Sequence, residues 1–183
     1  MMKWQKRLII ILIAVLTIYF GYKAIRAYDR RTDGFTVEKI ASTLPYNSSW
    51  DVTVTQEQID STNAILKQPF YYLARGFQCY AFQSADGKYV LKFVRHQRLR
   101  LSKYARFLPD IGFIDRWKKH KISEGAKRAR YLFSSMKTAF EAVPLETALI
   151  FVHINKTKNQ YGNVTIVDRI GDQFTINLDD YEF

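Results

Sequence analysis

Polar residues able to take part in chemistry are concentrated in the C-terminal third of the chain. The segment HINKTKNQYGN, residues 153–163, places Asn155 two positions after His153, and Asp179 follows Asn163 by sixteen positions within NLDD. A carboxylate at position 155 could accept a proton, whereas the amide of Asn155 has no protonation equilibrium near neutral pH. The spacing therefore indicates either a catalytic loop without its base or a polar connection between two strands.

A second polar group lies in a segment that predicts a strand, a turn and another strand. The stretch LARGFQCYAF contains Gly76, and YVLK places Lys92 after the Asp86-Gly87 turn. Glycine permits the close approach of backbone to phosphate, but only one glycine stands in this stretch. The alternative interpretation is an ordinary hairpin with a lysine that extends into solvent.

Together these motifs resemble the protein-kinase fold, and in particular the compact bacterial lipopolysaccharide and sugar kinases. The resemblance covers about residues 70–94 and 147–180. It implies that Gly76 and Lys92 contact phosphates. It also implies that Asn163 and Asp179 bind Mg²⁺. Asn155 occupies the position of the catalytic base, and Ala74 and Cys79 replace two of the three expected glycines.

The N-terminus carries an uncharged apolar run from Leu8 to Tyr22, flanked by basic residues on both sides. A spanning helix needs about 20 apolar residues, and the flanking Trp4 and Tyr22 suit the membrane interface. A cleaved signal peptide is the rival interpretation, but YKAIRAYD lacks a small-x-small cleavage site. We therefore favour an uncleaved signal-anchor. Basic residues on both sides leave the orientation open.

The net charge of +11 is unevenly distributed along the chain. Residues 95–130 hold twelve basic and three acidic residues, a net charge of +9, interleaved with aromatic side chains. In a protein tethered to a bilayer, such a segment favours contact with anionic headgroups. Nucleic acid and a merely solvated helix face are the alternatives. The candidate headgroup contacts are Arg95, Arg98, Arg100, Lys103, Arg106, Lys118, Lys119 and Lys121.

The pattern of elements predicts three regions, namely an anchor (1–31), a linker with short helices (32–69) and an α+β domain (70–183). Within the linker, Val37–Thr43 and a segment capped by Thr55 favour helices. Strands are expected at 70–75, 78–84, 88–94, 147–154, 163–168 and 173–180, and a basic helical segment at 95–146. We expect an antiparallel sheet packed on one long helix, like a kinase N-terminal lobe. The apolar stripe of that helix is Ile122, Ala126, Ala129, Phe133, Met136 and Phe140.

These patterns favour a non-catalytic, membrane-anchored binding or scaffold domain with a degenerate kinase-like core. Its expected partners are the lipid membrane and either a protein or anionic headgroups, without a cofactor. The alternative function is a small phosphotransferase that uses ATP and Mg²⁺ through Lys92, Asn163 and Asp179. We expect a single-pass protein of the bacterial cytoplasmic membrane, with the side of the domain open. The single cysteine excludes an internal disulfide, and the three scattered histidines argue against a zinc site.

Overall fold

A computed structural model describes residues 3–183 of the chain. The chain divides into two compact units, one reaching to Phe35 and the other comprising Thr36–Phe183. Each unit is described by itself below. The segment 36–69, expected as a linker, belongs to the second unit and contributes the buried side chains of Ile40 and Trp50.

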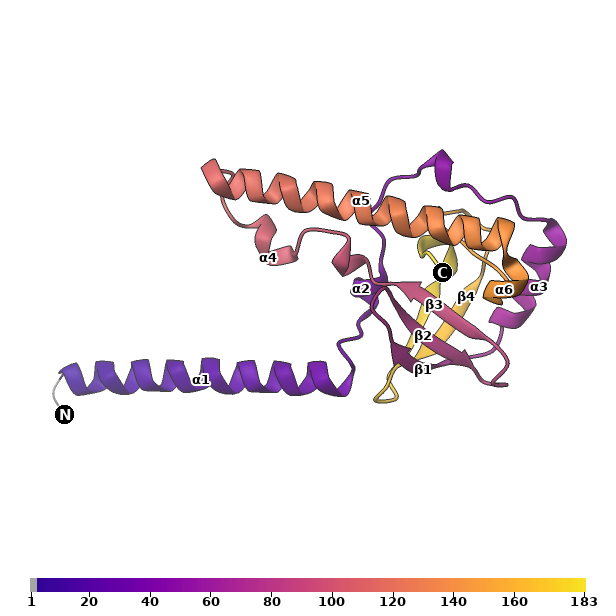
Figure 1. Ribbon diagram of the computed structural model, residues 1–183. Helices are drawn as coiled ribbons and strands as arrows, with labels where there is room; N and C mark the ends of the chain where they lie inside the picture. Colours follow the sequence, from indigo (N-terminus) through magenta and orange to yellow (C-terminus); the bar gives the residue numbers. More distant parts are fainter. Residues whose placement is uncertain (1–2) are drawn as a thin grey trace. The chain divides into compact units, whose positions relative to one another are not determined.

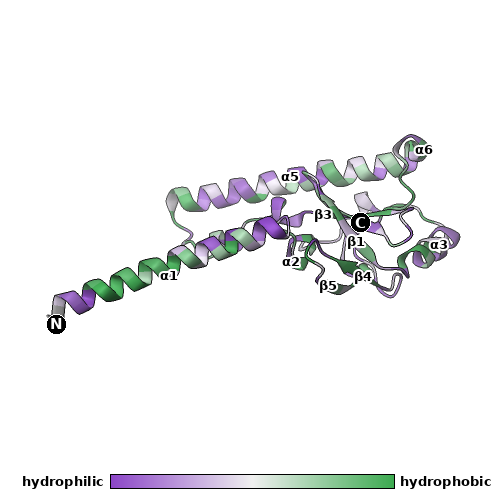
Figure 2. Ribbon diagram, turned by 90° about the horizontal axis from the view of Figure 1, so that it is seen from below, coloured by the Kyte–Doolittle hydropathy of each residue, from purple (hydrophilic) through white to green (hydrophobic). Residues whose placement is uncertain are grey.

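The first unit is dominated by helix α1, Lys3–Arg31. Within the described residues, it is the one helix long and apolar enough to cross a membrane, over Trp4–Arg31. None of its most apolar window is buried against protein. Figure 2 shows a short hydrophilic stretch at the start of α1, then a hydrophobic stretch, and more hydrophilic residues toward its C-terminal end. The predicted long apolar helix at the N-terminus is confirmed as a candidate membrane span.

The second unit contains a five-stranded mixed sheet of order β3-β2-β1-β4-β5 (Figure 1). Neighbouring strands are antiparallel except β1 and β4, which pair in parallel through Phe70 opposite Ile166. The expectation of a purely antiparallel sheet is therefore wrong at this pair. A parallel pair needs a long crossover, and β2, β3 and the long helix supply it. The strands are β1 (Phe70–Arg75), β2 (Cys79–Ser84), β3 (Val90–Val94), β4 (Asn163–Val167) and β5 (Gln173–Asn177).

Two predictions about local structure are confirmed. Helix α3 spans Gln56–Leu66 and begins with the capping box of Thr55 and Gln58. The turn between β2 and β3 contains Gly87 with a φ of +72°, a conformation that favours glycine. The shorter helices of this region are α2 (Val37–Ile40) and the 3-10 helix η1 (Ser48–Trp50).

Helix α5, Gly112–Ala142, buries only part of its length. Ala129, Phe133 and Phe140 lie in a core cluster with Trp50 and Val152. Ile122 and Ala126 were expected in the apolar stripe, but both are exposed. The N-terminal part of α5 extends away from the sheet (Figure 1). The neighbouring short helices are η2 (His96–Arg98), α4 (Lys103–Arg106) and α6 (Pro144–Thr147).

The segment 147–154 was expected as a strand and instead follows α6 without joining the sheet. It holds the chain after η3 (Leu178–Asp180), because His153 and Phe183 exchange two backbone hydrogen bonds of 2.7 and 3.0 Å. The carboxylate of Glu182 lies 2.8 Å from Nε2 of His96, and both side chains are buried. Residues 181–183 are thus held between η2 and the 147–154 segment.

Candidate functional site

The loop that begins at His153 is bound to the rest of the domain by its own polar side chains. Nδ1 of His153 donates to the carbonyl of Tyr181 at 2.7 Å, and Nε2 lies 3.2 Å from the hydroxyl of Thr157. The ring packs against Tyr161 and Phe183. Burial lowers the pKa of His153 from its ordinary value of 6.5. The structure therefore favours a neutral imidazole with both nitrogens engaged.

Asn155 connects this loop to the segment around η1. Its Nδ2 donates to the carbonyl of Asn47 at 2.9 Å and to the carboxylate of Asp51 at 2.6 Å. Its Oδ1 accepts from the backbone N–H of Asn47 at 3.2 Å. The Asn155 side chain therefore both donates and accepts hydrogen bonds. An amide can do both, whereas an ionised carboxylate can only accept. Asn155 is therefore bound to protein groups at both ends of its amide.

Asp179 is buried, and its carboxylate binds the same loop. One oxygen accepts from the hydroxyl of Thr157 and from the backbone N–H groups of Gln160 and Tyr161, the latter two at 3.2 Å. Burial, with the nearby charge of Asp179, raises the pKa of the Tyr161 phenol to about 12. Asn163 is exposed at the start of β4, opposite Asn177. The candidate metal pair thus consists of a buried loop-binding carboxylate and an exposed amide.

Gly76 and Lys92, the candidate phosphate contacts, lie at different places on the β1–β2–β3 unit. Gly76 is in the β1–β2 turn, where its N–H donates to the carbonyl of Cys79 at 2.9 Å and its own carbonyl accepts from Arg95. Lys92 is exposed on β3 and lines a pocket of about 600 Å³. The residues that line this pocket include neither Gly76 nor Asn155, Asn163 or Asp179. The structure does not gather the phosphotransferase candidates in this pocket.

Three of the eight basic residues proposed for headgroup contact bind protein groups instead. Arg95 donates to the carbonyl of Gly76, and Arg100 donates to the carbonyls of Glu38 and Ala41. Burial lowers the pKa of Arg100 from its ordinary value. Lys118 is buried, and its amine lies 2.5 Å from the carbonyl of Leu108 and 2.7 Å from the carboxylate of Asp110. These three side chains are therefore engaged with carbonyl and carboxylate groups of the domain.

The remaining five basic residues are exposed: Arg98, Lys103, Arg106, Lys119 and Lys121. Lys119 forms an ion pair of 2.8 Å with Asp115, one turn earlier on the helix. Large apolar side chains are exposed in the same part of the chain, with Phe107 at 89% and Phe113 at 74%. We call this region the α4–α5 tip, and define its apolar part as Tyr104, Phe107, Ile111 and Phe113.

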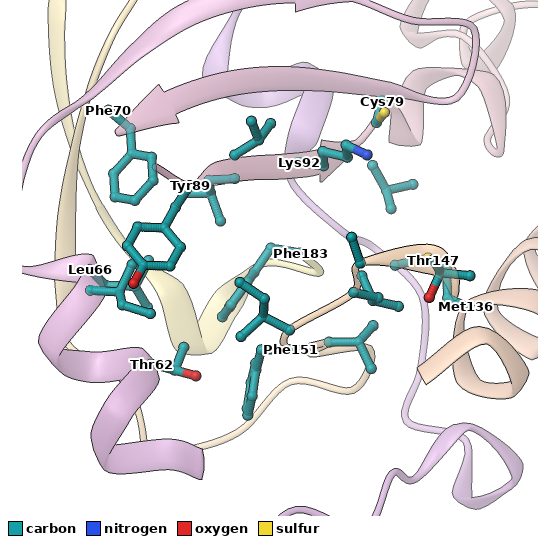
Figure 3. Close-up of a pocket in the computed structure, with 18 of the residues that line it drawn as sticks. Thr62, Leu66, Phe70, Cys79, Tyr89, Lys92, Met136, Thr147, Phe151 and Phe183 are labelled. Atoms are coloured by element: carbon teal, nitrogen blue, oxygen red, sulfur yellow. The ribbon is translucent and has the colours of Figure 1, made fainter. Parts of the chain in front are cut away.

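Sequence reasoning missed the pocket that Lys92 lines. Its walls come from α3, β3, the middle of α5 and the 147–152 segment (Figure 3). The signal in the sequence was the apolar run LIFV, residues 149–152, which we interpreted as a strand and which lines the cavity instead. Among residues 3–183, no group of His, Cys, Asp and Glu side chains is arranged to hold a metal ion.

Comparisons with known proteins found no match to this chain, either among protein-family models, among curated proteins or among solved structures. The interpretation of the site therefore rests on its own geometry.

Proposed function

We propose that this protein is a membrane-anchored, non-catalytic binding domain whose α4–α5 tip contacts an anionic lipid surface. In this proposal α1 is an uncleaved single-pass anchor in the bacterial cytoplasmic membrane. The observation that carries the proposal is the exposure of Phe107 and Phe113 in a stretch that also holds four exposed basic residues, Lys103, Arg106, Lys119 and Lys121. Soluble surfaces rarely gather large apolar side chains in this way, whereas interfacial segments combine them with Lys and Arg.

The internal structure of the tip supports this use. Lys118 binds the carbonyl of Leu108 and the carboxylate of Asp110, and so holds the chain before α5 against the helix. Ser102 caps α4 by accepting from the N–H of Ala105 at 3.2 Å. The apolar side chains are consequently presented by a braced segment rather than by a free loop. Ordering costs on binding are smaller for a surface that is already held in place.

The tether strengthens a weak surface contact. The apolar run of α1 ends at Tyr22, and the fourteen residues 23–36 lie between it and the start of α2. A segment of this length spans at most about 50 Å, which keeps the domain tethered within that distance of the bilayer. Each basic residue near an anionic surface contributes about 1 kcal/mol. Tethering makes the contact intramolecular, so a modest affinity produces a high bound fraction.

The test uses the full chain in nanodiscs, with an environment-sensitive fluorophore on a single cysteine in a Cys79→Ser background. We expect the probe at Phe113→Cys to shift to the blue and to be quenched by brominated lipid in anionic discs. Salt should reverse the shift, because the contacts are exposed and screened. Leu145→Cys is the matched control, since Leu145 is 92% exposed on α6 at the other end of α5.

Substitution of the exposed cations separates the electrostatic part of the contact. Replacing Lys103 and Arg106 with Gln should lower the bound fraction, by about fivefold in the docking equilibrium for each charge removed. The same change at Lys156 and Lys158, which are exposed on the 153–163 loop, should have no effect. Identical spectra for the probes at positions 113 and 145 in anionic discs would refute the proposal.

A further inference from the structure

The pocket that Lys92 lines is bordered by apolar side chains from several elements. Figure 3 shows Leu66, Phe70, Tyr89, Phe151 and Phe183 around the cavity, with Lys92 and Cys79 at the side of β3. Its volume of about 600 Å³ lies within the range of small-molecule sites. Nothing in this lining belongs to the α4–α5 tip, so the pocket is a separate feature of the domain.

The charged side chains in the lining are all of one sign. Lys88 and Lys92 are the two ionisable cations that contribute to the walls, and no Asp, Glu or His lines the pocket. Lys92 also lies close enough to Cys79 to act on its thiol, whose pKa is raised by burial and lowered in part by this lysine. An apolar cavity with a cationic wall is complementary to a molecule that is apolar along most of its length and anionic at one end.

β3 is an edge strand of the sheet, so an extended peptide is the competing occupant. The walls of the cavity favour an amphiphile. Apolar side chains from α3, α5 and the 147–152 segment close the pocket on the sides away from the strand edge. A polar peptide backbone entering these walls would lose hydrogen bonds to water that only one side of the pocket could replace.

We propose that this pocket binds a single-chain anionic amphiphile, such as a long-chain fatty acid. The chain lies among the apolar walls, and the carboxylate forms an ion pair with Lys92. A carboxylate bound in this way is satisfied by a charge-assisted contact rather than left buried alone. If α1 is the membrane anchor of the proposed function, the bilayer is a source of such molecules.

The single cysteine of the chain provides the readout, because Cys79 lines the pocket. The full chain in nanodiscs is treated with a maleimide, with and without palmitate. We expect palmitate to slow the modification of Cys79 roughly tenfold, as about 90% occupancy would do. Hexadecanol, which has the same chain without the charge, should protect less. Lys92→Ala should reduce the protection by palmitate to that by hexadecanol, and Lys92→Arg should restore it.

Three controls test whether the slower modification of Cys79 comes from ligand bound in the pocket. Each rate is compared with and without ligand in the same variant, because Lys92 also lowers the pKa of the thiol. Lys158→Ala, an exposed lysine outside the lining, should leave the protection unchanged. A cysteine at position 158 in a Cys79→Ser background should react equally fast with and without palmitate.

Two outcomes would overturn the proposal. The first is a rate of Cys79 modification that palmitate does not change. The second is equal protection by palmitate and hexadecanol in both the unmodified protein and Lys92→Ala, which would remove the role of the charge. Protection by an extended apolar peptide, but not by palmitate, would assign the pocket to strand addition at β3 instead. None of these outcomes depends on whether the tip contacts lipid.

Discussion

At the scale of single residues, Asn155 has a structural reason to be an amide. Its Nδ2 donates to the carbonyl of Asn47 and to Asp51, and its Oδ1 accepts from the N–H of Asn47. A carboxylate in this place would face an acceptor carbonyl and another carboxylate without a proton to donate. The residue at the base position of the kinase resemblance thus joins two segments of the domain.

We predict that Asn155→Asp destabilises the domain by about 1–3 kcal/mol at neutral pH, since it loses two donated hydrogen bonds and places two carboxylates together. Asn155→Ala should destabilise it less, because the repulsion is absent. Thermal unfolding of the full chain in nanodiscs measures both. An Asn155→Asp protein as stable as the unmodified one would show that these contacts contribute little.

His153 predicts a pH dependence of stability. Burial lowers its pKa in the folded state below the ordinary value of 6.5, so the unfolded chain binds a proton more readily. Its contribution is therefore fully present above pH 6.5 and decreases as the pH falls through that value toward the lowered folded pKa. The maximum slope from one such group is about 1.4 kcal/mol per pH unit.

Measuring the unfolding temperatures of the unmodified protein and of His153→Gln at pH about 7.5 and at pH about 5 isolates the contribution of His153. We expect the unmodified protein to lose more stability over this interval than His153→Gln, which removes the titrating group. Parallel curves for the two proteins would contradict the assignment to His153.

These roles could not be predicted from the sequence because the partners are distant along the chain. The side chain of Asn155 binds residues that precede it by 104 and 108 positions. The loop residues bound by Asp179 lie closer, but their arrangement depends on the loop being closed by η3. Residue types and spacing identified the loop, while its contacts follow from tertiary packing.

At the scale of elements, the position of α5 depends on one glycine. A Cβ added to Gly125 would lie 2.1 Å from the carbonyl oxygen of Leu99, which belongs to the backbone following η2. The close approach lets the helix pass over this segment, and the N-terminal part of α5 then extends toward the tip. Glycine in a helix costs about 1 kcal/mol relative to alanine, a cost that the contact offsets.

We predict that Gly125→Ala destabilises the domain by about 1–3 kcal/mol, since the overpacking against backbone outweighs the gain in helix propensity. Gly162→Ala is the matched control, because a Cβ there would meet nothing within 4 Å. Denaturant unfolding of the two variants should separate them. A stabilised Gly125→Ala protein would mean that α5 shifts at little cost.

The elements that the sequence predicted well are those fixed by short-range interactions. The capping box at Thr55 and the turn at Gly87 both depend on residues within a few positions of each other. The parallel pairing of β1 with β4 and the path of 147–154 depend on contacts across the whole domain. The apolar run at 149–152 was compatible with a strand, and only the packing against α3 and α5 assigns it to a pocket wall.

At the scale of the whole molecule, the apolar helix was predictable because a membrane span depends on composition and length alone. The extent of the second unit was not, since Trp50 lies in a polar stretch and packs against Phe133 with ring centroids 4.9 Å apart. The hydrophobic core beside α5 therefore includes a side chain from a segment that the sequence predicted as a linker.

The parallel pair of β1 and β4 has a consequence for biosynthesis. Phe70 pairs with Ile166, so the partner of β1 is synthesised 96 residues later. At about 5–20 residues per second, that edge of β1 stays unpaired for about 5–20 s after it is made. An open strand edge is a template for pairing with another chain. Crowding of nascent chains at one membrane site is therefore the condition under which this protein is most prone to misassemble.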